Sequence, residues 1–221
     1  METRACVQKS RTIRKFLPTP VPEETIEEII SEALWAPSWG NTQPWEFMVV
    51  TGTVMEKFKA ENRKALLSGE KSTPDIQMPE KWPDVLKSRY TDVGRTLFSS
   101  LSIARDDADA RLNYYGEMFH LFDAPAMLLV LLDTRLLLEY AMLDVGLFLQ
   151  TFMLLACDRG LGTAALAASV HFPQVARNVL PIPETKLLAI GAAIGWPDKS
   201  ASANNFERKR ARMEELVTWI S

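Results

Sequence analysis

The sequence predicts a single α/β (α+β) domain in which helices flank a central sheet. The chain has 221 residues, 47% hydrophobic and 24% charged, which is typical of a water-soluble domain with its own core. Helical and strand patterns alternate along it and are not grouped. Residues 126–133 (AMLLVLLD) and 186–196 (KLLAIGAAIGW) are short, almost wholly apolar runs, as expected of buried strands. No repeat or low-complexity linker divides the chain, so residues 1–221 are expected to form one domain.

The first half of the chain carries clear helix and strand signals. A helix is predicted from Pro22, which suits a first turn and is followed by two glutamates at the positive helix end. It is expected to stop at Pro37, before a polar loop and a strand over 45–51. Thr53 and Glu56 have capping-box spacing and predict the start of another helix. The apolar stripe of the first helix is formed by Ile26, Ile29, Ile30, Ala33 and Leu34.

Two segments differ in character from the rest. Residues 68–95 are charged, weakly periodic and interrupted by three prolines, which is typical of an excursion from the main body. Together with the helical pattern that follows, they predict a lid-like region around 68–122. Residues 198–221 begin with small polar residues and end in a charged amphipathic stretch, which we interpret as a C-terminal arm.

The stretch from Leu136 to Cys157 is long and apolar enough to span a bilayer. However, it contains Glu139 and Asp144, each of which is costly inside a membrane. A helix that is apolar on nearly all sides is equally expected at the centre of a protein or at a dimer seam. We therefore predict a buried helix, ended by the glycines of Gly160-Leu161-Gly162, and no membrane association.

Composition excludes several classes of function. A net charge of −3 offers no long-range attraction to nucleic acid. Cys6 and Cys157 form no CxxC pair, so two reduced thiols in a cytoplasmic protein are expected rather than a disulfide. Neither of the two histidines has metal-ligand spacing, so no metal site is predicted. The chain also lacks a GxGxxG dinucleotide fingerprint and a P-loop.

Three constellations could carry a binding site. Residues 10–14 (SRTIR) place two guanidiniums and a hydroxyl close together, which suits a phosphate. Residues 37–45 (PSWGNTQPW) form a loop rich in hydroxyl and amide groups, suited to the polar edge of a planar ring. Residues 208–212 form a basic cluster near the end of the chain. Each constellation has a simpler interpretation when taken alone. The first could be a solvated basic patch, the second an ordinary helix-to-strand connection, and the third a surface helix face of mixed charge.

Taken together and in this order, these pieces resemble the nitroreductase family of FMN enzymes. The resemblance runs through residues 10–16 (SRTIRKF), the VPEETI helix, PSWGNTQPWEFMVVT, GLGT at 160–163, and GWP at 195–197, and ends in the basic tail that Asn204 leads, Asn204 to Arg210. It covers nearly the whole chain except residues 62–120. It implies a mixed central sheet flanked by helices, and an intertwined homodimer with two FMN sites at the subunit interface.

The resemblance also implies a role for particular residues. The FMN phosphate and ribityl chain would be held by Arg11, Thr12 and Arg14, with Arg208 and Arg210 closing over the phosphate from the tail. Pro37, Ser38 and Asn41 would reach the flavin of the partner subunit. The backbone amides of Ala167 and Ala168 would lie against the N5 side of the flavin.

The activity implied is hydride transfer from NADH or NADPH, through FMN, to nitroaromatics, quinones or similar electron-poor small molecules by a ping-pong scheme. No catalytic side chain is required, because the chemistry belongs to the cofactor. Trp39, Phe119 and Phe122 are candidate walls of the substrate pocket, although single aromatics are more often core residues. The alternatives are a specialised member of the family (a reductive dehalogenase, a flavin-fragmenting enzyme or a heterocycle dehydrogenase) and a non-catalytic flavin-binding dimer.

Overall fold

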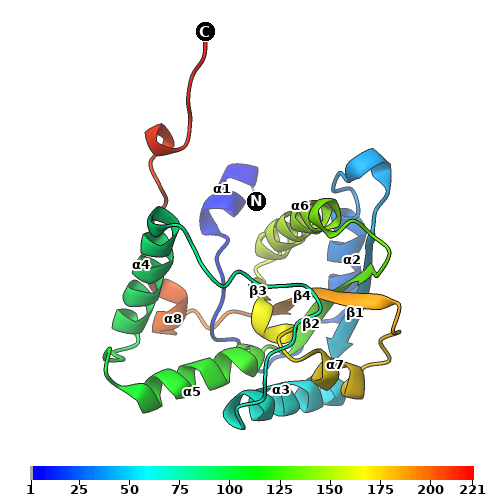
Figure 1. The fold of residues 1–221 in the computed structure, drawn as a ribbon, viewed down its shortest axis with the longest axis horizontal. Helices are drawn as coiled ribbons and strands as arrows, with labels where there is room; N and C mark the ends of the chain where they lie inside the picture. The colour runs from blue at the N-terminus through cyan, green and yellow to red at the C-terminus, as the bar shows by residue number, and fades with distance from the viewer. Residues whose placement is uncertain (1) are drawn as a thin grey trace.

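The computed structural model describes residues 2–221 and has a central four-stranded sheet between two groups of helices (Figure 1). The strands are β1 (Trp45–Thr51), β2 (Ala126–Asp133), β3 (Gly162–Leu166) and β4 (Lys186–Gly195), in the order β1-β2-β4-β3. All three strand pairs are antiparallel. Parallel pairing is found, among the described residues, at one isolated bridge between Thr12 and Thr163. The predicted α/β class is confirmed, but the four strands themselves form an antiparallel rather than a mixed sheet.

Strand β2 lies inside the sheet and is buried on both faces, which explains why its sequence is continuously apolar. Successive side chains of a strand point to opposite faces. Met127 and Leu129 accordingly pack into one hydrophobic cluster, whereas Leu128 and Val130 pack into another. The two clusters form the core on either side of the sheet.

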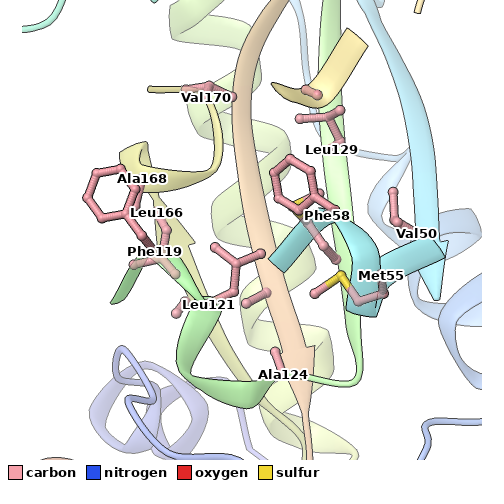
Figure 2. Packing of buried hydrophobic residues seen from close by; sticks show 14 of the residues in the cluster. Val50, Met55, Phe58, Phe119, Leu121, Ala124, Leu129, Leu166, Ala168 and Val170 are labelled. Atoms are coloured by element: carbon pink, nitrogen blue, oxygen red, sulfur yellow. The ribbon is translucent and has the colours of Figure 1, made fainter. Parts of the chain in front are cut away.

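The first cluster lies between the sheet and the helices α3 (Gly52–Leu67), α5 (Ala108–Phe119) and α7 (Pro173–Val179). Figure 2 shows Met55 and Phe58 of α3 in this cluster, near Leu129 of the sheet. Both α3 side chains are fully buried. The same cluster extends to Ala168, just beyond the end of β3, so the core directly supports this part of the expected site.

The second cluster lies under α2 (Glu23–Ala33) and α6 (Leu138–Asp158), which pack on each other. Ile26, Ile29 and Ala33 are buried and Ile30 is half-buried, as the helical stripe predicts. Leu34, the last residue of the predicted stripe, is instead the C-cap and is exposed. Helix α2 ends before Pro37, as expected. Helix α6 ends just before Gly160, whose φ of 78° is the left-handed conformation that favours glycine after a helix.

Among the residues that the structure describes, α6 is the one helix that is long and apolar enough to cross a membrane. It buries one face only: Phe148 and Phe152 lie in the core, whereas Leu143 and Leu147 are exposed on the other side. The predicted buried helix is therefore correct for one face of α6. Its opposite face is an apolar surface that this chain leaves uncovered.

The remaining elements are short or peripheral. They are α1 (Thr3–Lys9), which packs against α6, α4 (Asp84–Ser100), α8 (Ser202–Asn205) and the 3₁₀ turns η1 (Trp39–Asn41), η2 (Leu121–Asp123), η3 (Ala167–Ser169) and η4 (Met213–Glu215). After α8 the chain leaves the body of the molecule as an arm (Figure 1).

The start of α3 differs from the sequence prediction. The helix begins at Gly52 with Thr51 as its N-cap, and no side chain caps it. The predicted capping box of Thr53 and Glu56 is therefore wrong. Glu56 instead forms an ion pair with Lys59 at 2.7 Å. Residues three apart lie on the same face of a helix, so the same sequence spacing also fits this pair.

Candidate functional site

Two ends of the chain meet at the buried side chain of Asn204. Its Oδ1 accepts a hydrogen bond from the backbone N–H of Arg14 at 2.7 Å. Its Nδ2 donates to the carbonyls of Lys15 and Asp198, at 2.8 and 2.9 Å. Asn204 is 4% exposed, so these bonds are shielded from water. Sequence reasoning placed Asn204 only at the head of the basic tail, because nothing local shows that an asparagine will bridge distant segments.

This junction gathers positive charge. Arg208 donates to the carbonyls of Ser10 and Gln8, and Arg11 donates to the carbonyl of Asn204. Burial, and after it the charges of Arg11 and Arg210, lower the pKa of Arg208 from its ordinary value. Guanidiniums close enough to repel one another form a site in which a bound anion is stabilised. A phosphate dianion fits this donor set, because forked N–H groups match its oxygens.

In the extended segment over 10–14, neighbouring side chains differ in exposure to solvent. Ile13 is buried and Thr12 is exposed. Arg14 lies with its Cζ 5.3 Å from the ring centroid of Phe206. Burial raises the pKa of Tyr114, and the charge of Arg14 and a hydrogen bond from it act in the opposite direction, so Arg14 also lies near this tyrosine. Arg14 therefore joins the N-terminal segment, the tail and α5 at one place.

A cavity of about 490 Å³ opens beside this segment. Arg11 and Ile13 line it, together with Lys9 and Cys157, but neither Thr12 nor Arg14 does. The predicted phosphate residues consequently do not all share one pocket within the chain. Arg11 and Thr12 flank the segment on different sides, as neighbouring residues of an extended chain do.

The turn expected to meet the flavin ring begins where β3 ends. Ala167 is exposed and Ala168 is 4% exposed, and both belong to η3. The other end of β3 carries Thr163, which bridges to Thr12 and accepts the N–H of Ile13 at 2.9 Å. The predicted phosphate segment and the predicted ring segment thus lie at the two ends of the same strand.

The loop over 37–43 is anchored elsewhere. The backbone N–H of Trp39 donates to the carboxylate of Asp144, in the first third of α6. The segment over 10–13 instead lies by Cys157, at the far end of that helix. With a rise of 1.5 Å per residue, these two points of α6 are about 20 Å apart. Pro37, Ser38 and Asn41 are therefore not brought together with Arg11, Thr12 or Arg14 in this chain.

The three candidate pocket aromatics have different environments. Trp39 is 63% exposed and packs edge-on against Tyr140, with ring centroids 4.6 Å apart. Phe119 and Phe122 are 4% and 2% exposed and belong to the core. Their rings contact protein side chains, because α5 and η2 lead directly into the buried strand β2. They offer no open surface to a ligand, in contrast to the pocket walls expected from the sequence.

Comparisons with known proteins identify the relatives of the chain. Residues 7–196 match the model of the Nitroreductase family. The chain is 33% identical over 222 residues to a chloronitrobenzene nitroreductase from Comamonas testosteroni, covering 97% of this chain and 95% of the relative. It is 33% identical to a 4-nitrobenzoate reductase from Pseudomonas putida, covering 93% and 90%. Its structure is similar to that of the FMN and NADPH-dependent nitroreductase NfnB from Sphigopyxis sp. strain HMH, with a TM-score of 0.95, 28% identity and complete coverage of both chains.

Proposed function

The chain belongs to the nitroreductase family, and from this premise we propose that it is an FMN-dependent oxidoreductase that uses a reduced nicotinamide to reduce nitroaromatic compounds. The observation that carries the proposal is the meeting of Arg11 and Arg208 where the two ends of the chain join: Arg11 donates to the carbonyl of Asn204, and Arg208 donates to the carbonyl of Ser10. The same segment is bridged by Thr12 to one end of β3. Arg14 of the same segment provides a further guanidinium, which lies against the ring of Phe206 in the tail. This arrangement supports binding of one phosphate group at the edge of the sheet.

FMN fits the residues better than FAD does. The basic cluster suits a single phosphate, and the chain has no dinucleotide fingerprint. We assign Arg11, Thr12, Arg14, Arg208 and Arg210 to the phosphate and ribityl chain, and the amides of Ala167 and Ala168 to the flavin ring. When bound, FMN supplies the two-electron chemistry between the nicotinamide and the acceptor. The protein's part is to hold and orient the ring and to shape the space above it.

NADPH is the proposed hydride donor, because the structural relative with a TM-score of 0.95 is described as NADPH-dependent. NADH is the alternative donor, and the assay below compares the two. The proposed acceptors are nitrobenzene derivatives, since the two curated relatives are named for chloronitrobenzene and 4-nitrobenzoate. Quinones are further proposed acceptors, because they are also flat and electron-poor.

We propose that the active form is a cytoplasmic homodimer. The loop over 37–43 and the segment over 10–14 lie near opposite ends of α6, so one ligand can meet both only if a second copy contributes one of them. The exposed face of α6, with Leu143 and Leu147, offers an apolar surface for that copy. The C-terminal arm carries further exposed apolar side chains, Trp219 and Ile220 among them, that a partner can cover.

The test is a steady-state assay of the purified flavoprotein. NADPH and NADH are each supplied with nitrobenzene, a quinone and a halogenated phenol. We expect turnover of nitrobenzene and the quinone, and parallel double-reciprocal lines if donor and acceptor use the same place in turn. Turnover of the halogenated phenol alone would replace the proposal by a dehalogenase. A protein that takes up no FMN, or whose bound flavin neither nicotinamide reduces, would overturn it.

A further inference from the structure

The turn η3 is fixed by a hydroxyl that is inserted into the sheet. Ser169 Oγ donates to the carbonyl of Leu166 at 2.6 Å and accepts the N–H of Gly191 at 2.8 Å. The hydroxyl thus bridges β3 and β4 at Leu166 and Gly191, the last pair of residues in the pairing of the two strands. Gly191 permits this approach, because a Cβ there would lie 2.5 Å from Ser169 Oγ. The chain consequently leaves the sheet at Ala167 in a defined direction.

A second side chain holds the other end of the same turn. Asn62 of α3 donates from Nδ2 to the carbonyl of Ala168 at 3.0 Å and to that of Phe119 at 2.6 Å. Both neighbours are acceptors, so the amide orientation is determined by the surroundings. Asn62 is fully buried, and its Oδ1 has no hydrogen-bond partner among the described residues. The side chain therefore contributes its two donor hydrogens to this region and leaves its acceptor unused.

These bonds set the direction of the backbone amides. In a planar trans peptide, the C=O of one residue and the N–H of the next point in opposite directions, and no cis peptide occurs among the described residues. Ser169 holds the Leu166 carbonyl, so the Ala167 N–H is turned the other way. The N–H of Val170 holds the Ala167 carbonyl at 3.0 Å, which turns the Ala168 N–H likewise. Asn62 holds the next carbonyl, that of Ala168.

We propose that Asn62 and Ser169 are a pair of positioning residues for the flavin ring, an inference that rests on the proposed FMN-binding function. They fix the peptides on either side of the Ala167–Ala168 peptide. The two amides assigned to the ring are thereby held in place before the cofactor binds. Asn62 also connects this turn to the end of α5 through its bond to the carbonyl of Phe119.

The pair acts on the ring and not on the phosphate, which provides the test. The flavin-free protein is titrated with FMN and with riboflavin, which lacks the phosphate. The variants are Ser169→Ala, which removes one hydroxyl, and Asn62→Leu, which keeps the approximate shape and removes both donors. The matched control is Phe58→Leu, a buried change on the same helix as Asn62 that leaves the bonds to the turn intact.

We expect each of the two variants to weaken FMN binding and riboflavin binding by the same factor. That factor should be about two- to tenfold, because each variant loses one hydrogen bond to a carbonyl next to the assigned amides, that of Leu166 or Ala168. The midpoint potential of bound FMN should also shift in both. Phe58→Leu should lower the melting temperature but change neither the flavin affinities nor the potential. Unchanged riboflavin affinity and potential in both Ser169→Ala and Asn62→Leu would overturn the inference. A wild-type protein that binds neither flavin would overturn the proposed function as well.

Discussion

The carboxylate of Asp144 accepts the backbone N–H of Trp39 with both oxygens, at 3.1 and 3.2 Å. Asp144 is 3% exposed and lies in a largely apolar helix. A buried carboxylate is costly without a hydrogen-bond partner, and the Trp39 N–H is such a partner. The loop it holds has left-handed backbone at Gly40, Asn41 and Gln43, with φ between 46° and 59°. Asp144 thereby fixes a strained loop that is proposed to reach the flavin of the partner subunit.

Replacing Asp144 with Ala should destabilise the flavin-free protein by about 1–3 kcal/mol, because the Trp39 N–H loses its acceptor. Asp144→Asn keeps an acceptor oxygen and should cost less. Urea denaturation of the wild type and both variants measures the difference. Equal stability of Asp144→Ala and the wild type would show that the loop does not depend on this carboxylate.

Replacing Arg14 with Ala should weaken FMN binding by about 1.5–3 kcal/mol, the contribution of one charge-assisted hydrogen bond. Fluorescence titration of the flavin-free protein gives the affinity. Arg135→Ala is the control, since Arg135 is exposed and pairs with Asp133 at the end of β2. If Arg14→Ala and Arg135→Ala bind FMN equally well, Arg14 does not belong to the cofactor site.

Replacing Asn204 with Ala should both destabilise the fold and weaken FMN binding. The change leaves the Arg14 N–H and two carbonyls without their buried partner, which costs about 1–3 kcal/mol for each unsatisfied group. Asn205→Ala is a matched control, because Asn205 is exposed and its Nδ2 bonds only to carbonyls of its own segment, those of Lys199 and Ala201. Denaturation and FMN titration should both separate the two variants. Identical behaviour would refute the role of Asn204 as the junction of the two chain ends.

Placing a charge on the exposed face of α6 should break the proposed dimer. Leu143→Asp introduces an anion at an apolar position that is 58% exposed in the single chain. Val54→Asp makes the same change on α3, on the opposite side of the sheet, where no second copy is proposed. Sedimentation at micromolar concentration should give dimers for the wild type and Val54→Asp, and monomers with weakened FMN binding for Leu143→Asp. A folded, flavin-loaded wild-type monomer would contradict the proposal.

Sequence patterns determined the elements whose signals are local. The apolar runs at 126–133 and 186–196, the stripe of α2 and the glycine after α6 depend on residues close together in the chain. The structure has each of these elements, with the second strand ending one residue earlier, at Gly195, and the α2 stripe ending at Ala33. The motif order also led to the nitroreductase family. The basic segment at 10–14 and the tail at 208–210 could be singled out, because forked cations near a hydroxyl suit a phosphate wherever they occur.

Only the tertiary structure decided which distant groups meet. Asn204 and Asn62 form hydrogen bonds with segments more than 50 residues away in the chain. The local sequence around neither asparagine predicts which segment it will bind. The same is true of Phe119 and Phe122, whose rings enter the core because α5 and η2 lead into a strand buried on both faces. Periodicity reports which face of an element is apolar, whereas the identity of the neighbour depends on how the layers pack. The apolar sequence of α6 therefore predicted a helix, and its packing showed that one face remains uncovered.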